Sequence, residues 1–336
     1  MNADTVIQLA HGGGGRLTRE LIESEIVPRF GNGPLRGLPD GATLPSPGER
    51  LVFTTDSFVV QPLEFPGGNI GDLAVHGTVN DLAVCGGEPK WLSLALIIEE
   101  GLPFSVLGRI LDAVRAAADA CGVTVATGDT KVVARGQGDG LYVNTAGIGL
   151  ALPEFDLGME RIREGDCVLV SGTLADHGMA VMSARQNMDF TDGPRSDTGT
   201  VHRLVLAVRG FGAAVRFMRD PTRGGAAAVL NEMVEGRELG ILLKERELPL
   251  APATRAVAEM LGIDPLHAAS EGRLILICDR EVAPEILARW RAMSEGAGAV
   301  CLGTVTRDRG RVVMETVTGG RRLVDVPRGE LLPRIC

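Results

Sequence analysis

Five aspartates stand in apolar or glycine-rich surroundings: Asp40, Asp56, Asp81, Asp129 and Asp220. An unpaired buried carboxylate is energetically costly, so such side chains are expected beside a cation or a set of hydrogen-bond donors. Carboxylate oxygens and water are the ligands that Mg²⁺ uses when it bridges phosphate groups. Any single aspartate is as well explained as a helix cap or a turn residue. As a set, they favour a magnesium–nucleotide site.

The stretch Asn69–Cys85 predicts a helix that carries further polar side chains. Its first residue is a good N-cap, and two glycines follow its last residue. Asp72, His76 and Asn80 are spaced four residues apart, so they share one face of the helix. Asp81 lies next to that face, which places it close to the same polar group.

Three glycine-containing motifs are candidates for phosphate contacts. Thr127–Lys131 (TGDTK) is expected to begin a loop, Thr127–Gly140, between two strands, where small residues admit phosphate and the lysine adds charge. It lacks the spacing of a Walker A motif. Arg219–Gly225 (RDPTRGG) precedes an expected helix, whose free amide groups bind anions. His11 is followed by four glycines. Each motif has an alternative explanation: Lys131 of the first as a solvated surface residue, the second as an ordinary Asp-Pro helix start, and the third as a flexible N-terminus.

The sequence ends on Cys336. A free thiol has a pKa near ~8.5, so only a few per cent is thiolate at neutral pH. A thiol on a mobile arm can visit different sites, although chemistry alone favours an incidental last residue. None of the six cysteines forms a CxxC pair, and Cys121, Cys167 and Cys278 lie in apolar or strand-like stretches. This usage indicates reduced, core cysteines.

Hydrophobic periodicity predicts the elements that position these residues. The expected strands are 51–60, 123–126, 141–150, 167–170, 273–278, 300–305 and 311–317, and the expected helices are 69–85, 103–121, 176–188, 222–235 and 281–293. The predicted organisation is a flexible segment with a glycine-rich loop (1–50), a first domain (51–155), a second domain (156–318) and a flexible tail (319–336).

Composition excludes several classes of protein. With 45% hydrophobic and 23% charged residues over 336 positions, both domains can bury a core. A formal net charge of −9 and 4% aromatic residues argue against a nucleic-acid binder. No apolar run approaches the ~18 residues of a membrane span, and no signal peptide is evident. We therefore expect a cytoplasmic protein without membrane or nucleic-acid partners.

Taken together, the motifs resemble the HypE family of [NiFe]-hydrogenase maturation factors. The similarity runs in order along nearly the whole chain and ends on the family's characteristic PRIC. The matching segments are TTDSFVVQPLEFPGGNIGDLAVHGTVNDLAV (54–84), IIEEGLP (97–103), TGDTKVVARG (127–136), NTAGIG (144–149), SGTLADHG (171–178), RDPTRGG (219–225), EG (271–272) and PRIC (333–336).

The resemblance implies an α+β protein with the two-domain architecture of aminoimidazole ribonucleotide synthetase. N-terminal sheets would pair into a barrel across a homodimer, with ATP in the cleft between domains. The implied partner HypF carbamoylates the terminal cysteine. The chain would dehydrate this S-carboxamide to a thiocyanate with ATP, and the cyano group would pass to iron on the HypC–HypD complex.

The resemblance also assigns roles to individual residues. Asp40, Asp81 and Asp220 match metal-binding aspartates, and Glu271 is the implied proton acceptor. Lys131 would orient the amide or stabilise developing charge. Cys336 carries the substrate. The implied nucleotide-binding residues are Asp56, His76, Asn80, Gly128, Asp129, Thr130 and Arg223.

The chain departs from the family pattern at two positions. Ser270 stands where many members have asparagine, and His76 where many have cysteine. Two other readings remain open at this stage. A small-molecule phosphotransferase of the same superfamily would explain the aspartates but gives the tail no role. A carrier that only holds a group on Cys336 would leave the aspartates idle.

Overall fold

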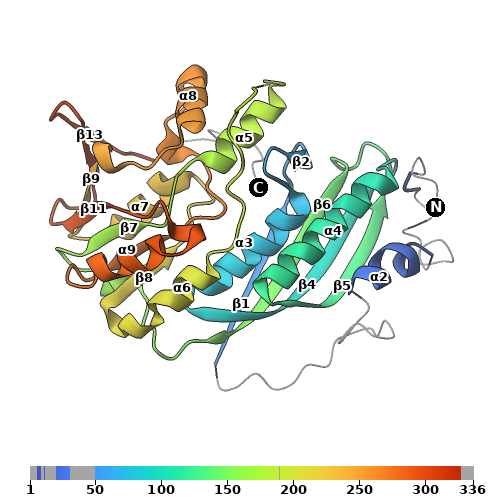
Figure 1. Ribbon diagram of the computed structural model, residues 1–336, viewed down its shortest axis with the longest axis horizontal. Coiled ribbons are helices and arrows are strands. Elements are labelled where there is room, and N and C mark those ends of the chain that lie inside the picture. The colour runs from blue at the N-terminus through green and yellow to red at the C-terminus, as the bar shows by residue number, and fades with distance from the viewer. Residues whose placement is uncertain (1–5, 9–10, 12–19, 31–49, 189, 327–336) are drawn as a thin grey trace.

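The computed structural model describes residues 6–8, 11, 20–30, 50–188 and 190–326. Two units lie side by side, each built on one large sheet with helices packed against it (Figure 1). Asp40, the glycines after His11 and Cys336 lie outside the described residues, so the predictions made for them stay predictions. Among the described residues, no helix combines the length and the apolar character of a bilayer-spanning segment.

The N-terminal unit is a four-stranded sheet in the order β1-β6-β4-β5, with β4 and β5 parallel and the other pairs antiparallel. Two long helices cover one of its faces (Figure 1). Its elements are α2 (Val27–Phe30), β1 (Leu51–Phe58), β2 (Glu64–Phe65), β3 (Gly68–Asn69), α3 (Ile70–Val84), β4 (Gly87–Glu99), α4 (Phe104–Cys121), β5 (Thr124–Val133) and β6 (Leu141–Ala151).

Both predicted helices of this unit are confirmed, together with their end signals. The Asn69 side chain accepts hydrogen bonds from the amides of Gly71 and Asp72, and the Asp72 carboxylate accepts one in return from the Asn69 amide. This capping box satisfies amide groups that would otherwise lack partners at the start of α3. Helix α4 ends at Gly122, which adopts the left-handed conformation with φ of 69°.

The other face of the N-terminal sheet carries exposed apolar side chains. Phe53 on β1 is 68% exposed, and Ile97 on the central strand β4 is 42% exposed. The sheet has two free edges, so the described part of a single chain closes no barrel. The barrel expected from the resemblance therefore needs a second copy.

The C-terminal unit is a seven-stranded mixed sheet in the order β13-β12-β9-β11-β7-β10-β8. Its elements are β7 (Cys167–Val170), α5 (Asp176–Arg185), α6 (His202–Val208), β8 (Val215–Arg219), α7 (Gly225–Val234), β9 (Gly240–Lys244), α8 (Pro252–Leu261), β10 (Ile275–Cys278), α9 (Ala283–Arg291), β11 (Val300–Thr306), β12 (Val312–Glu315) and β13 (Arg321–Leu323).

Both faces of this sheet are buried, because helices cover it on two sides. On β7, Val168 and Val170 pack with α7, whereas Cys167 and Leu169 pack with α6 and α9. A strand buried on both faces is expected to be continuously apolar, as this one is. The predicted core cysteines are confirmed: Cys121, Cys167 and Cys278 are buried, and all five cysteines in the described residues are free thiols.

Two sequence predictions are wrong. The expected loop Thr127–Gly140 begins as seven further residues of strand β5, paired in register with β4. Gly128 fits there because a Cβ atom at this position would lie 2.4 Å from the Leu94 carbonyl oxygen of β4. The tail also begins later than expected, since Arg321–Leu323 pair with β12. The predicted domain boundary at residue 155 falls between β6 and β7.

Candidate active site

A pocket of about 640 Å³ opens between the two units. Strand β1 contributes Thr54 and Asp56, and the last turn of α3 contributes Asp81. The segment between β8 and α7 contributes Asp220 and Arg223. The structure thus brings together four of the residues singled out from the sequence, across 167 positions of chain between Asp56 and Arg223.

Three carboxylates in this pocket disfavour one another's ionisation. Burial, and then the negative charge of Asp81, raise the pKa of Asp220 to about 7. Burial and the nearby Asp56 raise the pKa of Asp81, although the Thr54 hydroxyl donates a hydrogen bond to its Oδ2 at 3.0 Å. Buried carboxylates of like charge are stabilised by a cation. The donor set is therefore of the kind that suits a divalent metal bound together with phosphate oxygens.

The carboxylates do not form a complete metal cage by themselves. No group of three or more His, Cys, Asp or Glu side chains in the described part of the chain is arranged to hold a metal ion. Mg²⁺ commonly takes only one or two protein carboxylates and fills its remaining positions with water and substrate phosphate. The residues present fit that mode of binding, which requires the nucleotide.

Two arginines stand at the pocket. Arg223 Nη2 donates to Asp56 Oδ1 at 2.8 Å, and its side chain is 77% exposed. Arg219 Nη2 lies 3.4 Å from Glu232 Oε2 of α7. Guanidinium groups with this exposure are available to phosphate oxygens.

Gly224 and Gly225 both have positive φ, and a Cβ atom on Gly225 would lie 2.4 Å from the Leu266 carbonyl oxygen.

Glu271, in the C-terminal unit, is only 1% exposed and does not line the pocket. One of its carboxylate oxygens, Oε1, is buried without a hydrogen-bond partner. Burial raises the pKa of Glu271 well above its ordinary value, and the nearby Asp220 and Asp197 raise it further. A buried carboxyl group with a raised pKa and an unused oxygen is the expected state of a proton-transfer residue.

Ser270, where the chain departs from the family pattern, anchors this region. Its hydroxyl accepts a hydrogen bond from the Ala175 amide at 2.8 Å, at the start of α5, and its own amide donates to the Pro221 carbonyl at 3.0 Å. Serine therefore keeps a polar contact on the residue before Glu271.

The predicted residues Gly128, Asp129, Thr130 and Lys131 do not line this pocket. They lie on β5, which β6 and β4 separate from β1, a span of roughly 14 Å across three strand spacings. Lys131 Nζ lies 3.3 Å from Asp129 Oδ1, and both side chains are exposed. Within one chain, Lys131 is therefore separated from the pocket carboxylates by the width of the N-terminal sheet, and it makes no contact with Glu271 in the described part of the chain.

His76 and Asn80 also lie outside the pocket lining, at the junction of the two units. His76 Nδ1 is 3.4 Å from the Thr198 hydroxyl, and burial lowers the pKa of His76 to about 4. Its imidazole is thus neutral at neutral pH and offers phosphate no positive charge. Asn80 is fully buried, and its amide bonds the backbone of Gly199, Val201 and Glu271.

Sequence reasoning missed two features of this region. Cys85 lines the pocket at the end of α3, next to Asp81 in space. Asp197 contacts the Glu271 backbone from 74 positions away. The position of Cys85 after a predicted helix bearing Asp81 was a usable signal. No sequence signal marks Asp197, because its importance depends on long-range packing.

Comparisons with known proteins identify the family. Residues 39–151 match the N-terminal domain of AIR synthase related proteins, and residues 163–315 match the corresponding C-terminal domain. The carbamoyl dehydratase HypE of Rhizobium leguminosarum bv. viciae is 48% identical over 332 residues, covering 98% of this chain and 95% of that protein. The chain belongs to the carbamoyl dehydratase HypE family. The HypE of Escherichia coli (strain K12) is 41% identical over 335 residues, covering 98% of this chain and 99% of that protein.

Solved HypE structures share the fold along nearly the whole chain. The hydrogenase maturation protein HypE in complex with ATP superposes with a TM-score of 0.92 at 40% identity, covering 98% of this chain and 99% of that one. A HypE chain from a HypE–HypF complex has a TM-score of 0.80 at 39% identity, covering 93% of this chain and 100% of that one. Thiamine monophosphate kinase from Aquifex aeolicus, at 19% identity and a TM-score of 0.60, shares the fold alone.

Proposed function

We propose that this chain is an ATP-dependent carbamoyl dehydratase that converts an S-carboxamide on its own Cys336 into a thiocyanate. The product would supply the cyanide ligand of a [NiFe]-hydrogenase iron. The observation that carries the proposal is the pocket between the units, where Asp56, Asp81, Asp220 and Arg223 line one cavity. Membership of the HypE family supports it, as does the ATP complex of a HypE relative.

The pocket has an apolar part and a charged part, which suggests how ATP binds. Phe53, Val84, Leu157 and Phe217 form apolar lining suited to a nucleobase, whereas Arg223 and the carboxylates lie in the polar part. Phosphate groups would contact Arg223 and the amide groups at the start of α7. Mg²⁺ held by Asp81 and Asp220 would neutralise charge on the transferring phosphoryl group when it binds.

The reaction needs the amide oxygen to become a leaving group. Attack of this oxygen on the γ-phosphorus forms an O–P bond, breaks the bond to ADP and, with loss of one of the two amide protons to water, gives an O-phosphoryl imidate. Loss of the remaining nitrogen proton then expels phosphate and leaves a carbon–nitrogen triple bond. The raised pKa of Glu271 makes its carboxylate a stronger proton acceptor for this step. Its Oε1, which is buried without a hydrogen-bond partner, would accept the amide hydrogen.

The C-terminal segment is long enough to reach this site. Val326, the last described residue, lines a second pocket beside α7 that shares Glu232 with the active-site pocket. Ten residues follow Val326 in the sequence, and an extended chain covers ~3.3 Å per residue, about 33 Å in all. The two pockets, which share Glu232, therefore offer a route by which Cys336 would arrive beside the carboxylates.

A second copy of the chain would complete the site. The exposed apolar face of the N-terminal sheet, which includes Phe53 and Ile97, suits a homodimer contact. Two sheets packed face to face lie ~10 Å apart, which is closer than the separation of β5 from β1 within one chain. We infer that Lys131 of a second copy supplies the positive charge that Glu271 lacks in its own chain, with Asp129 paired to that lysine.

The proposed reaction requires one partner that loads Cys336 and another that accepts the cyano group. The HypE–HypF complex of relatives supports a HypF carbamoyltransferase that loads Cys336, and the HypC–HypD complex is the proposed acceptor of the cyano group. The five free cysteines in the described part of the chain support a reducing compartment, the cytoplasm. A small-molecule phosphotransferase is not favoured, because the relatives are carbamoyl dehydratases.

Intact-protein mass spectrometry tests the proposal. The chain is carbamoylated with HypF, and ATP and Mg²⁺ are then added. The expected result is an ATP-dependent loss of one water from the peptide ending at Cys336. A carbamoyl group that ATP leaves unchanged would support a carrier, and no modification of Cys336 would support a phosphotransferase.

A further inference from the structure

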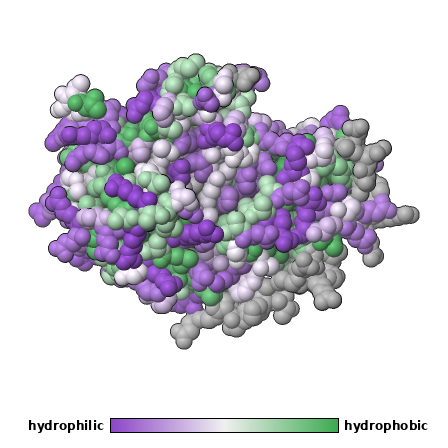
Figure 2. All heavy atoms as spheres, viewed as in Figure 1, coloured by the Kyte–Doolittle hydropathy of each residue, from purple (hydrophilic) through white to green (hydrophobic). Residues whose placement is uncertain are grey.

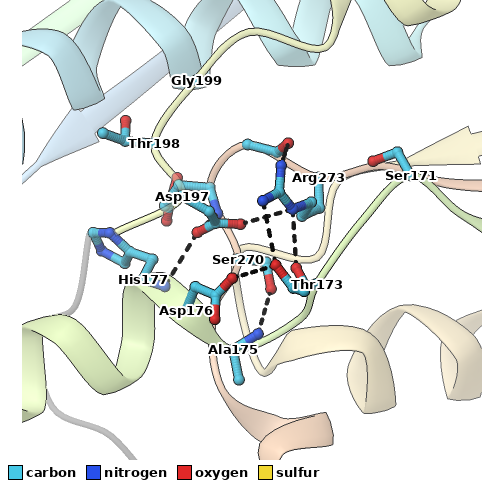
Figure 3. A network of polar contacts seen from close by, with 12 residues as sticks. Ser171, Thr173, Ala175, Asp176, His177, Asp197, Thr198, Gly199, Ser270 and Arg273 are labelled. Atoms are coloured by element: carbon cyan, nitrogen blue, oxygen red, sulfur yellow. Dashed lines mark hydrogen bonds and ion pairs between the residues drawn. The ribbon is translucent and has the colours of Figure 1, made fainter. Parts of the chain in front are cut away.

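The segment Ser196–Gly199, which we call the strap, contacts both units, and its Asp197 points toward His177 and Arg273 (Figure 3). The Ser196 amide donates to the Pro66 carbonyl of the N-terminal unit at 2.7 Å. The Asn80 side chain of α3 donates to the Gly199 carbonyl at 2.9 Å. The strap is therefore fixed at both ends to the unit that does not contain Glu271.

Asp197 projects from the strap into the C-terminal unit, where its side chain is 1% exposed. Its Oδ1 accepts a hydrogen bond from the His177 amide at 3.1 Å (Figure 3). The same oxygen accepts one from the Glu271 amide, also at 3.1 Å. Its Oδ2 lies 3.5 Å from Arg273 Nε. The first turn of α5 has no side-chain cap from its own N-cap residue, Ala175, so Asp197 performs that role from outside the helix.

The turn that carries Glu271 is pressed against the strap. A Cβ atom on Gly272 would lie 2.0 Å from the Asp197 carbonyl oxygen, so no larger residue fits without displacing the strap. On the other side, the Asn80 side chain donates to the Glu271 carbonyl at 2.9 Å. Both backbone polar groups of Glu271 are thus held by side chains, and neither side chain belongs to its own local segment.

We propose that Asp197 is a positioning residue for Glu271, acting through the hydrogen bond to the Glu271 amide and the ion pair with Arg273. This inference rests on the proposed role of Glu271 as the proton acceptor. The hydrogen bond to the Glu271 amide fixes the backbone that carries the Glu271 side chain. A misplacement of ~1 Å at a reacting group lowers a rate by about 100-fold.

Asp166 supplies a matched control in the same unit. It is 4% exposed, accepts a hydrogen bond from the Arg163 amide at 2.8 Å and lies 3.8 Å from Arg216 Nε. It therefore contacts one backbone amide and one arginine, where Asp197 contacts two backbone amides and one arginine. It precedes Cys167, which pairs with Cys278 at the end of β10 farther from Glu271.

The first experiment does not depend on the dehydration reaction. Hydrogen exchange is measured by mass spectrometry on Asp197→Ala, Asp197→Asn and Asp166→Ala. We expect the Glu271 amide to exchange about 10- to 100-fold faster in Asp197→Ala, since its acceptor is gone. Asp197→Asn keeps a side-chain oxygen and the protection, and Asp166→Ala exposes the Arg163 amide instead. Unchanged exchange at Glu271 in Asp197→Ala would overturn the inference.

The second experiment is a double-mutant cycle on ATP-dependent water loss. We expect Asp197→Ala to lower kcat about 100-fold with little change in the Kd for ATP, because Asp197 does not line the nucleotide pocket. In the Glu271→Gln background the same change should leave kcat within about threefold. An equal loss in both backgrounds would show a general structural role and overturn the inference. A wild-type protein that loses no water refutes the proposed function instead, and the exchange result still decides whether Asp197 positions Glu271.

Discussion

Arg223 of the C-terminal unit donates from Nη2 to Asp56 Oδ1 on strand β1 of the N-terminal unit, at a distance of 2.8 Å. The pair spans the pocket between the units, and both side chains line it. Since the arginine is 77% exposed, the pair itself adds little stability. Its significance is positional, because it holds a guanidinium group beside Asp81 and Asp220.

Replacing Arg223 with alanine should weaken ATP binding. Charge-assisted hydrogen bonds to phosphate contribute ~1.5–3 kcal/mol, so we expect the Kd for ATP to rise by about 10- to 100-fold. Isothermal titration calorimetry measures this directly. Arg307→Ala is a suitable control, because Arg307 is 80% exposed, forms an ion pair with Glu164 and does not line the pocket. Equal affinity in both variants would show that Arg223 does not contact the nucleotide.

Replacing Asp81 or Asp220 with asparagine should abolish most of the dehydration. Each substitution removes a negative charge from the proposed metal position while keeping the side-chain size. Removing one electrostatic contact to a transferring group lowers kcat by about 100- to 1,000-fold. The rate of water loss from the carbamoylated protein is the readout. Asp112→Asn, at an exposed residue paired with Arg29, should leave the rate of water loss unchanged. If Asp81→Asn lost water at the wild-type rate, Asp81 would not hold the metal.

The stability of the protein should depend on pH through Asp220. Its folded-state pKa of about 7 lies above its ordinary value of 3.8, so between these values the folded chain binds more protons than the unfolded one. The stability contributed by this group is therefore present below pH ~4 and lost as the pH rises to ~7. Mg²⁺ stabilises the ionised form. We expect Mg²⁺ to raise Tm more at about pH 8 than at about pH 5.5, and Asp220→Asn to remove the difference. Equal Mg²⁺ effects at both pH values would contradict this assignment.

Phe53→Glu should separate the proposed homodimer into monomers. The substitution places a charge on the exposed apolar sheet face, where burial in an interface is unfavourable. Light scattering after size exclusion gives the mass. Met260→Glu is the matched control, because Met260 is 63% exposed on α8 of the other unit. A dimer that survives Phe53→Glu, or a monomeric wild type, would rule out this interface.

A complementation experiment asks whether the site is shared between two copies. Lys131→Ala and Asp81→Asn are each expected to be inactive. The two variants are mixed and their dimers are dissociated and re-formed. If the site takes Lys131 from a second copy, about a quarter of the wild-type activity should return, because half of the dimers are mixed and each mixed dimer has one intact site of two. No recovery would place both residues in one site of one chain.

The amphipathic elements could be predicted from the sequence because their signals are local. The spacing of apolar residues and the glycine after Cys121 located α4, and the side chain of Asn69 located the start of α3. The loop expected at Thr127–Gly140 was wrong because Gly128 was read as a loop residue. Glycine is required there by the close approach of β4, which no local pattern reveals.

The candidate site could be predicted only in part, for the same reason. Asp56, Asp81 and Asp220 stood out as polar residues in apolar surroundings, and the structure places all three in one pocket. The grouping of Lys131 with Glu271 came from the family resemblance, and one chain alone does not bring them together. Asp197 lies in a segment without regular secondary structure, and only the folded chain shows its contact with Glu271.

The most direct test of the account follows the carboxamide oxygen. Cys336 is carbamoylated with a carbamoyl group that carries a heavy oxygen isotope, ATP and Mg²⁺ are added, and the released inorganic phosphate is analysed by mass spectrometry. The account predicts that the label appears in phosphate, in step with the loss of water from the peptide, because the amide oxygen leaves bonded to phosphorus. Thiocyanate formed with unlabelled phosphate would contradict it.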